Sequence, residues 1–338
     1  MPATIQDVAR LAGVSTATVS RALRGLPNVS HTTRLHVLRI AEEVNYHITP
    51  HVSRIASGRR VIGVVVPMVD QWFYSKLASV IELELLAYGV DAVRYSVDSI
   101  ESQVSLLRHV TARKLVDGLV LCSLCYTAET VAVLQKAGIA VVTIETHTPE
   151  FPSVGIDNEE AAAMGTRYLI NLGHRRIAII SGMEDAPLQF AIPQARKRGY
   201  QKALAQNGIK YRPALDQPGN YIYQGGAEAM KVLFAVQQPP TAVFAFSDEM
   251  AIGALKTAQD MSLRVPDDIS IMGFDDNDVA EYVGLTTVRQ PVNEFGELAV
   301  SQIVYQLDAE YEPRASAQPE AELMVRTTVG RPPQTAAE

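Results

Sequence analysis

Residues 4–25 read TIQDVARLAGVSTATVSRALRG, a stretch that predicts two short helices joined by a tight turn. Thr4 and Asp7 stand three residues apart, the spacing of a capping box, in which each side chain satisfies a free backbone N–H at the start of a helix. Gly13 lies where the chain must turn, because glycine adopts the left-handed conformation without steric penalty. We therefore expect a first helix that ends near Ala12 and buries one apolar stripe: Ile5, Val8, Ala9 and Ala12.

The second predicted helix begins after Ser15, whose hydroxyl suits an N-cap. Val19 and Leu23 fall on the face expected to point inward, whereas small, polar and basic residues occupy the outer face. In a helix-turn-helix, residues near the N-terminus of the second helix contact base edges in the major groove of DNA. The stretch therefore predicts a helix that contacts DNA bases, with a helical pair inside a larger bundle as the alternative.

Three outer residues of this second helix are candidates for reading bases. Arg21 can form a bidentate pair with O6 and N7 of guanine, Ala17 can contact the methyl group of thymine, and Thr16 can do either weakly.

A third helix is expected from about Ser30 to Val44, because four apolar residues there have helical spacing and would close a three-helix core: Val37, Leu38, Ala41 and Val44.

The charge of the chain is divided unevenly. Residues 1–60 contain eight arginines, no lysine and three acidic residues, a formal charge of +5, whereas the whole chain carries −7. This leaves −12 for residues 61–338, a segment that would repel DNA. Such asymmetry points to a polyanion that binds at one end only. The N-terminal segment is therefore the expected DNA-binding end.

From Val61 onward, continuous apolar runs alternate with helical stretches. A continuous apolar run marks a strand that is buried on both faces of a sheet, and alternation with helices implies right-handed crossovers and parallel sheets. The segment is too long for one comfortable core, so we expect two α/β subdomains with a ligand between them at the carboxyl ends of the strands. The predicted strands are 61–66, 115–122, 139–144, 177–180, 242–246 and 269–274.

Short motifs along the N-terminal segment resemble the headpiece of the LacI/GalR family of bacterial repressors: Asp7-Val8-Ala9, Ala12-Gly13-Val14-Ser15, Thr18-Val19-Ser20-Arg21, Val29-Ser30 through Thr33-Arg34, and Tyr46. The resemblance covers nearly the whole chain. It implies an all-α helix-turn-helix headpiece followed by a two-subdomain, periplasmic-binding-protein-like α/β core with parallel sheets. It also implies that the chain crosses between the subdomains near Asp157, near Arg289 and near residue 323.

The resemblance gives an expected domain division. A helix-turn-helix DNA-binding domain is followed by a hinge helix with its linker, an effector-binding and dimerisation domain, and a polar tail, over residues 1–47, 48–60, 61–331 and 332–338. Within the third of these, the N-subdomain takes about 61–157 and 290–322, and the C-subdomain takes about 158–289 and 323–331.

The family places a short hinge helix in the minor groove of DNA. Thr49 and Pro50 suit the N-cap and first position of a helix over residues 50–57, and Gly58 suits its end. Isolated helices need roughly 12 to 15 residues in water, so this helix is expected to order only on DNA and against its dimer mate. Ile55 matches the family's leucine that wedges between base pairs, with packing against the headpiece or the dimer mate as the alternative.

The hinge departs from the family at several positions. His47-Ile48-Thr49-Pro50 replaces the usual segment rich in Pro, Asn and Ala, and Ile replaces Leu at position 55. The residues that we expect to contact DNA, from both the residue pattern and the resemblance, are Thr4, Ser15, Thr16, Ala17, Ser20, Arg21, Arg24, Ser30, Arg34, Tyr46, Ile55 and Ala56.

The resemblance also implies an effector site between the subdomains. Arg196 matches the arginine that grips the effector, Asp275 matches the acidic ligand contact, and Ser247 stands where Asn is usual. An arginine and an aspartate that face each other suit a neutral polyhydroxylated ligand, and aromatic faces stack on a sugar ring. Loop packing or helix capping is the alternative for each residue. The expected effector contacts are Asp70, Gln71, Phe73, Tyr74, Arg196, Tyr221, Ser247, Asp275 and Gln290.

Other chemistry finds no support in the sequence. Cys122 and Cys125 form a C-x-x-C, but they are the only cysteines, and a structural zinc site needs four ligands. We find no dinucleotide fingerprint, phosphate-binding loop or nucleophile elbow, so we expect no cofactor, no metal and no enzymatic activity. The N-terminus lacks a signal segment and no apolar run approaches the roughly 18 residues of a membrane span, so we expect a cytoplasmic protein without membrane contact.

These features predict a transcriptional regulator, most simply a repressor. It would bind a pseudo-palindromic double-stranded DNA operator as a homodimer, under the control of a sugar or sugar-like effector in the cleft. A sugar-binding transport-type protein would share the two-lobed core but would need an export signal and no basic headpiece. A sugar-active α/β enzyme would need a nucleophile or a metal constellation.

Overall fold

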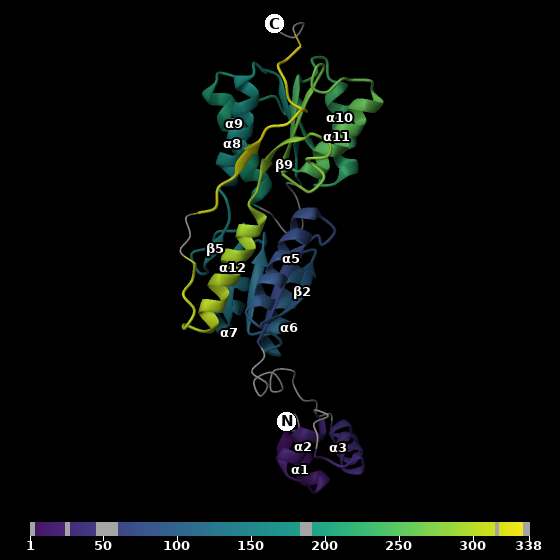
Figure 1. Cartoon of the computed structure of the whole chain (residues 1–338), viewed down its shortest axis with the longest axis vertical. Coiled ribbons are helices and arrows are strands. Elements are labelled where there is room, and N and C mark those ends of the chain that lie inside the picture. Colours follow the sequence, from purple (N-terminus) through teal and green to yellow (C-terminus); the bar gives the residue numbers. More distant parts are fainter. Residues whose placement is uncertain (1–3, 24–27, 45–59, 183–190, 315–317, 334–338) are drawn as a thin grey trace.

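The computed structural model describes residues 4–23, 28–44, 60–182, 191–314 and 318–333 (Figure 1). The N-terminal unit consists of three helices: α1 Ile5–Ala12, α2 Thr16–Leu23 and α3 His31–Glu43. Thr4 and Asp7 form the expected capping box, and Gly13 ends α1 with a φ of 65°. The hydroxyl of Ser15 accepts a hydrogen bond from the backbone N–H of Thr18 at 3.1 Å, which confirms the predicted start of α2.

The core of the headpiece differs from the expectation at α3. Val37 and Ala41 are buried as predicted, but Leu38 is 42% exposed and Ile40 takes a core position instead. The reason is helical geometry, because Ile40 follows Val37 by three residues and shares its face, whereas Leu38 is rotated by about 100°. The buried apolar residues are Val8, Ala9, Ala12, Val19, Ala22, Val37, Ile40 and Ala41.

The first sheet has five parallel strands in the order β2-β1-β3-β4-β5. Helix α12 packs against α5 and β4, so this lobe takes a helix from late in the sequence (Figure 1). The strands are β1 Val61–Pro67, β2 Asp91–Val97, β3 Gly118–Cys122, β4 Ala140–Ile144 and β5 Ser153–Val154. The helices are α5 Trp72–Ala87, α6 Ile100–Ala112, α7 Ala128–Ala137 and α12 Val292–Leu307.

The second sheet has six strands in the order β11-β10-β9-β8-β6-β7, of which β11 is antiparallel to β10. Its strands are β6 Ile177–Ser181, β7 Asp216–Pro218, β8 Ala242–Ala245, β9 Ser270–Asp275, β10 Thr286–Arg289 and β11 Glu322–Met324. Its helices are α8 Asn158–Asn171, α9 Ile192–Gln206, the short 3₁₀ helix η1 Pro213–Leu215, α10 Tyr223–Phe234 and α11 Asp248–Asp260.

All six predicted strands are present, because each is a continuous apolar run whose residues are buried within a sheet. The chain passes from the first sheet to the second between β5 and α8, returns between β10 and α12, and passes again before β11. Three connections therefore join the lobes. The parallel strands of both sheets present their carboxyl ends to the region between the lobes, where a ligand is expected to bind.

One glycine sets the distance between α8 and α9. A Cβ at Gly199 would lie 1.9 Å from the carbonyl oxygen of Glu159, so the two helices pack more closely than any other residue would allow. The close packing brings the start of α9, with Arg196, beside the start of α8, with Asn158. The fold thereby positions one of the predicted site residues.

A buried histidine links the last described segment to the second sheet. The ring Nε2 of His174 donates to the carbonyl oxygen of Gly330 at 2.9 Å, and in the neutral ring Nδ1 then accepts from the hydroxyl of Thr241. Burial lowers the pKa of His174, and the bond to Gly330 opposes this only in part. The folded protein therefore favours the neutral ring.

We expect this histidine to destabilise the fold on acidification. Because its pKa is lower in the folded than in the unfolded protein, its contribution to stability is complete above about pH 6.5 and falls as the pH drops below that value. The slope is at most about 1.4 kcal/mol per pH unit. Urea unfolding from pH 7.5 to pH 5 tests this, with His174→Gln as the reference that lacks the titrating ring. Equal pH slopes in the two proteins would contradict the prediction.

Candidate functional site

The outer face of α2 carries the residues predicted to read bases. Thr16, Ala17 and Arg21 are exposed, and Ser20 is half-buried between them and the core. Thr4, Ser15 and Ser30 are exposed helix caps, since their hydroxyls accept from backbone N–H groups of Asp7, Thr18 and Thr33. Arg34 is half-buried on α3. The remaining predicted contacts lie outside the described residues: Arg24, Tyr46, Ile55 and Ala56.

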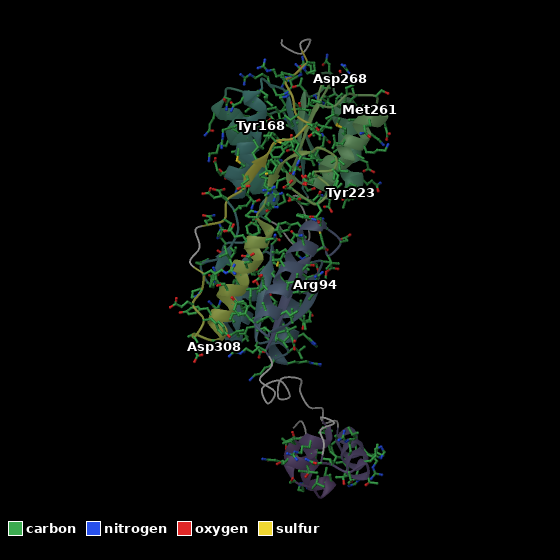
Figure 2. All side chains as sticks on the ribbon, viewed as in Figure 1. Arg94, Tyr168, Tyr223, Met261, Asp268 and Asp308 are labelled. Atoms are coloured by element: carbon green, nitrogen blue, oxygen red, sulfur yellow. The ribbon has the colours of Figure 1, made fainter. Side chains whose placement is uncertain are left out.

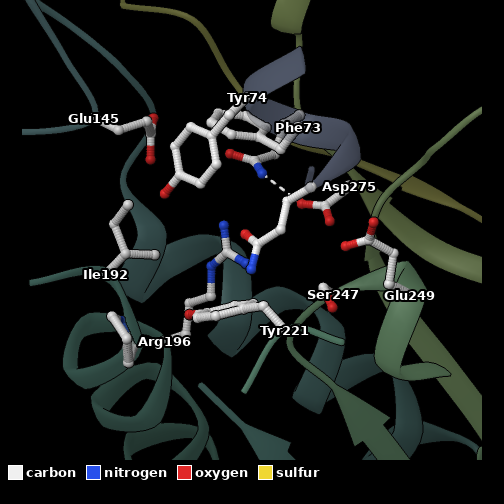
Figure 3. A pocket seen from close by; sticks show the side chains of 12 residues that line it. Phe73, Tyr74, Glu145, Ile192, Arg196, Tyr221, Ser247, Glu249 and Asp275 are labelled. Atoms are coloured by element: carbon white, nitrogen blue, oxygen red, sulfur yellow. Dashed lines mark hydrogen bonds between the residues drawn. The ribbon is translucent and has the colours of Figure 1, made fainter. Parts of the chain in front are cut away.

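A cavity lies between the two lobes (Figure 3). Its lining comes from the carboxyl ends of strands in both sheets and from the first turns of the following helices. Every predicted effector residue except Asp70 lines it. The lining residues are Gln71, Phe73, Tyr74, Glu145, Ile192, Pro193, Arg196, Tyr221, Ser247, Glu249, Asp275 and Gln290.

Asp70 lies outside the lining of the cavity. It is exposed in the turn after β1, where the backbone N–H of Gln71 donates to the carbonyl oxygen of Met68 at 3.1 Å. This turn reverses the chain before α5 begins, so Gln71 and Tyr74 line the cavity whereas Asp70 does not.

Arg196 is held rigidly at one wall of the cavity. Its Nε donates to Oδ1 of Asn158 at 2.9 Å and its Nη1 donates to the carbonyl oxygen of Phe246 at 2.6 Å. The guanidinium carbon lies 3.5 Å from the ring centre of Phe274, a cation–π contact. The side chain is therefore oriented before any ligand binds, which reduces the entropy lost on binding.

Glu145 continues this network into the first lobe. Its carboxylate accepts from the backbone N–H of Ile156 at 2.9 Å and from the side-chain amide of Asn158. Burial raises the pKa of Glu145, while these two hydrogen bonds and the nearby guanidinium of Arg196 lower it. Glu145 thus ties the end of β4 to the crossing segment and, through Asn158, to Arg196.

The opposite side of the cavity is acidic. Oδ1 of Asp275 accepts from the amide of Gln290 at 2.7 Å, and Glu249 accepts from the backbone N–H of Trp72 at 3.2 Å. Asp248 lies behind them, where Thr287 and the backbone N–H of Asn277 donate to it. Burial raises the pKa of all three carboxyls, that of Asp275 to about 7, with the carboxyl of Asp275 adding to the shift at Asp248.

Contacts across the mouth of the cavity join the lobes directly. The indole N–H of Trp72, at the start of α5, donates to Asp278 at 3.1 Å, and its backbone N–H donates to Glu249. Both acceptors belong to the second lobe. These bonds would change if the lobes moved, so the cavity is mechanically linked to the relative position of the lobes.

Two polar residues of the cavity have different roles. The hydroxyl of Ser247 accepts from the backbone N–H of Met250 at 3.2 Å, which caps α11 and leaves its proton available for a ligand. The hydroxyl of Tyr221 is buried and has no hydrogen-bond partner among the described residues. Burial raises the pKa of Tyr221 to about 12, so this hydroxyl is a donor at neutral pH.

Four lining residues were not predicted: Glu145, Ile192, Pro193 and Glu249. Glu145 directly follows a predicted buried strand, and Glu249 follows another by three residues. Their positions just after strand ends could therefore have identified them as candidate lining residues. Ile192 and Pro193 begin α9, and the proline in its first turn is a helix-start signal that the prediction did not use.

No helix in the described part of the chain is long and apolar enough to span a membrane. The same residues contain no group of three or more His, Cys, Asp or Glu side chains arranged to hold a metal ion.

Sequence comparison matches residues 4–48 to the model "Bacterial regulatory proteins, lacI family" and residues 166–329 to "Periplasmic binding protein-like domain". Catabolite control protein A of Priestia megaterium is 36% identical over 316 residues, which cover 92% of this chain and 94% of that protein.

Two solved structures extend the likeness. The transcriptional regulator CelR in complex with cellobiose matches with a TM-score of 0.69 and 30% identity, over 96% of this chain and 99% of that one. The lac repressor dimer bound to operator and the anti-inducer ONPF matches with a TM-score of 0.72 and 26% identity, over 98% and 100%.

A helix-turn-helix unit joined to a two-lobed core with a cavity defines a DNA-binding transcriptional regulator rather than an enzyme. The chain belongs to the lacI family of bacterial regulatory proteins.

Proposed function

We propose that the protein is a repressor whose affinity for its operator is lowered by a sugar or sugar-like effector in the cavity between the lobes. The observation that carries this proposal is the cavity itself, because both lobes contribute polar and aromatic side chains to it. An arginine with fixed orientation, a carboxylate and two tyrosines suit the hydroxyls and the apolar faces of a sugar ring. The solved complex of CelR with cellobiose supports this ligand class.

The protein acts as a homodimer in this proposal. One headpiece contacts only a few base pairs, and two-fold symmetry doubles the contact on a pseudo-palindromic operator. Leu83 and Leu86 on α5 are 68% and 67% exposed, and the neighbouring strand β2 is an edge of its sheet. Exposed apolar residues beside a sheet edge suit association with a second copy. The lac repressor dimer on its operator supports this arrangement.

The domain division follows the same plan. The headpiece takes residues 1–47, the hinge and linker take 48–60, and the effector-binding and dimerisation domain takes 61–331. The N-subdomain comprises about 61–157 and 290–322, and the C-subdomain comprises about 158–289 and 323–331. The order in which the chain joins the two sheets supports this division. As a regulator of transcription, the protein would work in the cytoplasm.

Residue roles follow the geometry. Thr16, Ala17 and Arg21 would contact base edges, with Thr4, Ser15, Ser20, Ser30 and Arg34 beside them, and Arg24, Tyr46, Ile55 and Ala56 would complete the contact with DNA. In the cavity, Arg196, Asp275 and Gln290 would bind ligand hydroxyls, while Phe73, Tyr74 and Tyr221 would contact ring faces. Closure of the lobes around the ligand would change the separation of the paired hinge segments and release the DNA.

Fluorescence anisotropy with DNA that flanks the gene tests the proposal. The full chain should bind this DNA and should dissociate when a suitable sugar is added. Linkage requires the DNA to weaken sugar binding by the same factor, typically equivalent to about 1 to 3 kcal/mol. Sugar binding with no change in DNA affinity would contradict the proposed control, and failure to bind any DNA site specifically would contradict the proposed regulator.

We expect Arg21→Ala to weaken operator binding by about 1 to 3 kcal/mol and to relax the preference for one guanine in each half-site. Arg10→Ala is the matched control, because Arg10 lies on α1, is paired with Asp7 and would contribute only charge. Loss of the Arg10 side chain should weaken binding to all DNA sequences alike and should have little effect on base preference. Anisotropy with single-base operator variants measures both effects. An unchanged base preference in Arg21→Ala would mean that another face of the headpiece reads the operator.

A further inference from the structure

The cavity contains more acidic than basic side chains. Glu145, Glu249 and Asp275 line it and are each less than a tenth exposed, and Arg196 is the one cationic side chain among its described lining residues. Asp248, which is completely buried behind Asp275, adds a fourth carboxyl. Charges in a poorly hydrated site interact strongly, so an anionic ligand such as a sugar phosphate or a uronate is disfavoured.

The acidic groups are concentrated on one side. The carboxylates of Asp275 and Glu249 lie close together on the side of the cavity away from Glu145 (Figure 3). The charge of Arg196 lowers the pKa of Asp275 in part, but the two donated hydrogen bonds described for Arg196 go to Asn158 and to the carbonyl oxygen of Phe246. Within the described part of the chain, no ion pair reaches Asp248, Glu249 or Asp275, although the neighbouring Asp276 is paired with both Arg289 and Arg326.

A second observation at the same place concerns Gln290. Its side chain is 4% exposed, and its amide nitrogen donates to Asp275. The amide oxygen of Gln290 therefore lies close to the same carboxylate, and it is buried with no hydrogen-bond partner among the described residues. A buried acceptor without a donor is unfavourable, so this corner suits a ligand that donates hydrogen bonds.

We propose that the effector is an amino sugar whose ammonium group binds between Asp275, Glu249 and the amide oxygen of Gln290. This inference rests on the proposed function, because it concerns the effector of the same cavity. An ammonium group supplies three donors and one positive charge to a corner that offers only acceptors. Burial raises the pKa of Glu249 and Asp275, and a bound cation would favour their ionised forms again.

The test compares matched ligands on the full-length chain by isothermal titration calorimetry at pH 7.5. The panel contains glucosamine, galactosamine and mannosamine, each with its parent hexose, its N-acetyl derivative and the corresponding uronate. We expect one amino sugar to bind about tenfold or more tightly than its parent hexose and its N-acetyl derivative, and the uronates not to bind.

Glu249→Gln tests the assigned position. The glutamine keeps the size of the side chain and an oxygen that accepts from Trp72, but it removes the charge. We expect the preference for the amine over the parent hexose to fall about tenfold. The control is Glu159→Gln, which removes one charge from a residue outside this cavity that is paired with Arg198 and Lys202, and its preference should equal that of the wild type.

The outcomes separate this inference from the proposed function. If a parent hexose or a uronate binds as tightly as the corresponding amino sugar, the amino-sugar proposal is overturned, whereas the proposal of a carbohydrate effector is retained. Absence of binding by every member of the panel overturns the amine and counts against a hexose effector as well. A preference that survives unchanged in Glu249→Gln overturns the position assigned to the ammonium group.

Discussion

Asp275→Asn should shift the response of the operator complex to effector concentrations about 10- to 100-fold higher, while operator affinity without effector stays within about twofold of the wild-type value. The carboxylate is buried in the cavity, where it accepts from Gln290 and faces the ligand space. A hydrogen bond to a charged group contributes about 1.5 to 3 kcal/mol, so effector affinity should fall about 10- to 100-fold. Anisotropy titrations of the operator complex with effector measure this loss.

Asparagine is the suitable replacement because the backbone at Asp275 has a φ of 123°, which asparagine tolerates better than alanine does. The substitution should also stabilise the fold at higher pH. Since burial raises the pKa of Asp275 to about 7, its ionisation opposes folding as the pH rises through that value, and an uncharged residue avoids this. Thermal melts of both proteins at pH 6 and pH 8 provide the control for folding.

Three results would contradict this prediction in different ways. An unshifted response of Asp275→Asn to the same effector would remove Asp275 from the binding site. Loss of operator binding in a folded variant would give the residue a role in coupling rather than in ligand contact. The difference in melting temperature between Asp275→Asn and the wild type should increase from pH 6 to pH 8. A decrease in this difference would contradict the direction of the pKa shift at Asp275.

Much of the architecture follows from patterns that are local in the sequence. The capping box of Thr4 and Asp7 and the continuous apolar runs depend on near neighbours, so they predicted α1 and the buried strands correctly. Strand β2 was missed because, as an edge strand, most of its residues are exposed or half-buried, and the apolar run is therefore broken. Local hydrophobicity detects strands that are buried on both faces.

The cavity shows where such reasoning stops. Residues carried over from the family lie together because parallel strands end at one edge, and Asp70 lies outside the cavity lining because one tight turn exposes it to solvent. The network of Glu145, Asn158 and Arg196 joins the end of β4 to the first turns of α8 and α9. No spacing rule links those residues, since their contact depends on where the chain crosses between the lobes.

A double substitution, Leu83→Lys with Leu86→Lys, should convert the protein to a monomer and lower its affinity for a full operator about 100-fold or more. Both leucines are exposed and lie three residues apart on α5, which packs against the edge strand β2 (Figure 1). Burial of two lysines at an apolar interface is strongly unfavourable. Binding of the second headpiece would then no longer be intramolecular, and such linkage increases affinity by about 10²- to 10⁴-fold.

The charge change makes this test demanding, because added lysines favour DNA binding by simple electrostatics, so a loss of affinity must come from the loss of the dimer. Met261→Lys is the control, since this exposed residue lies at the far end of the second lobe, away from α5 (Figure 2).

Sedimentation velocity and anisotropy with full and half operators measure assembly and binding. Affinity for a half-site should equal that of the wild type, because each headpiece is intact. A double variant that remains a dimer with unchanged operator affinity would place the interface on another surface, whereas a variant that loses half-site binding as well would have lost its fold.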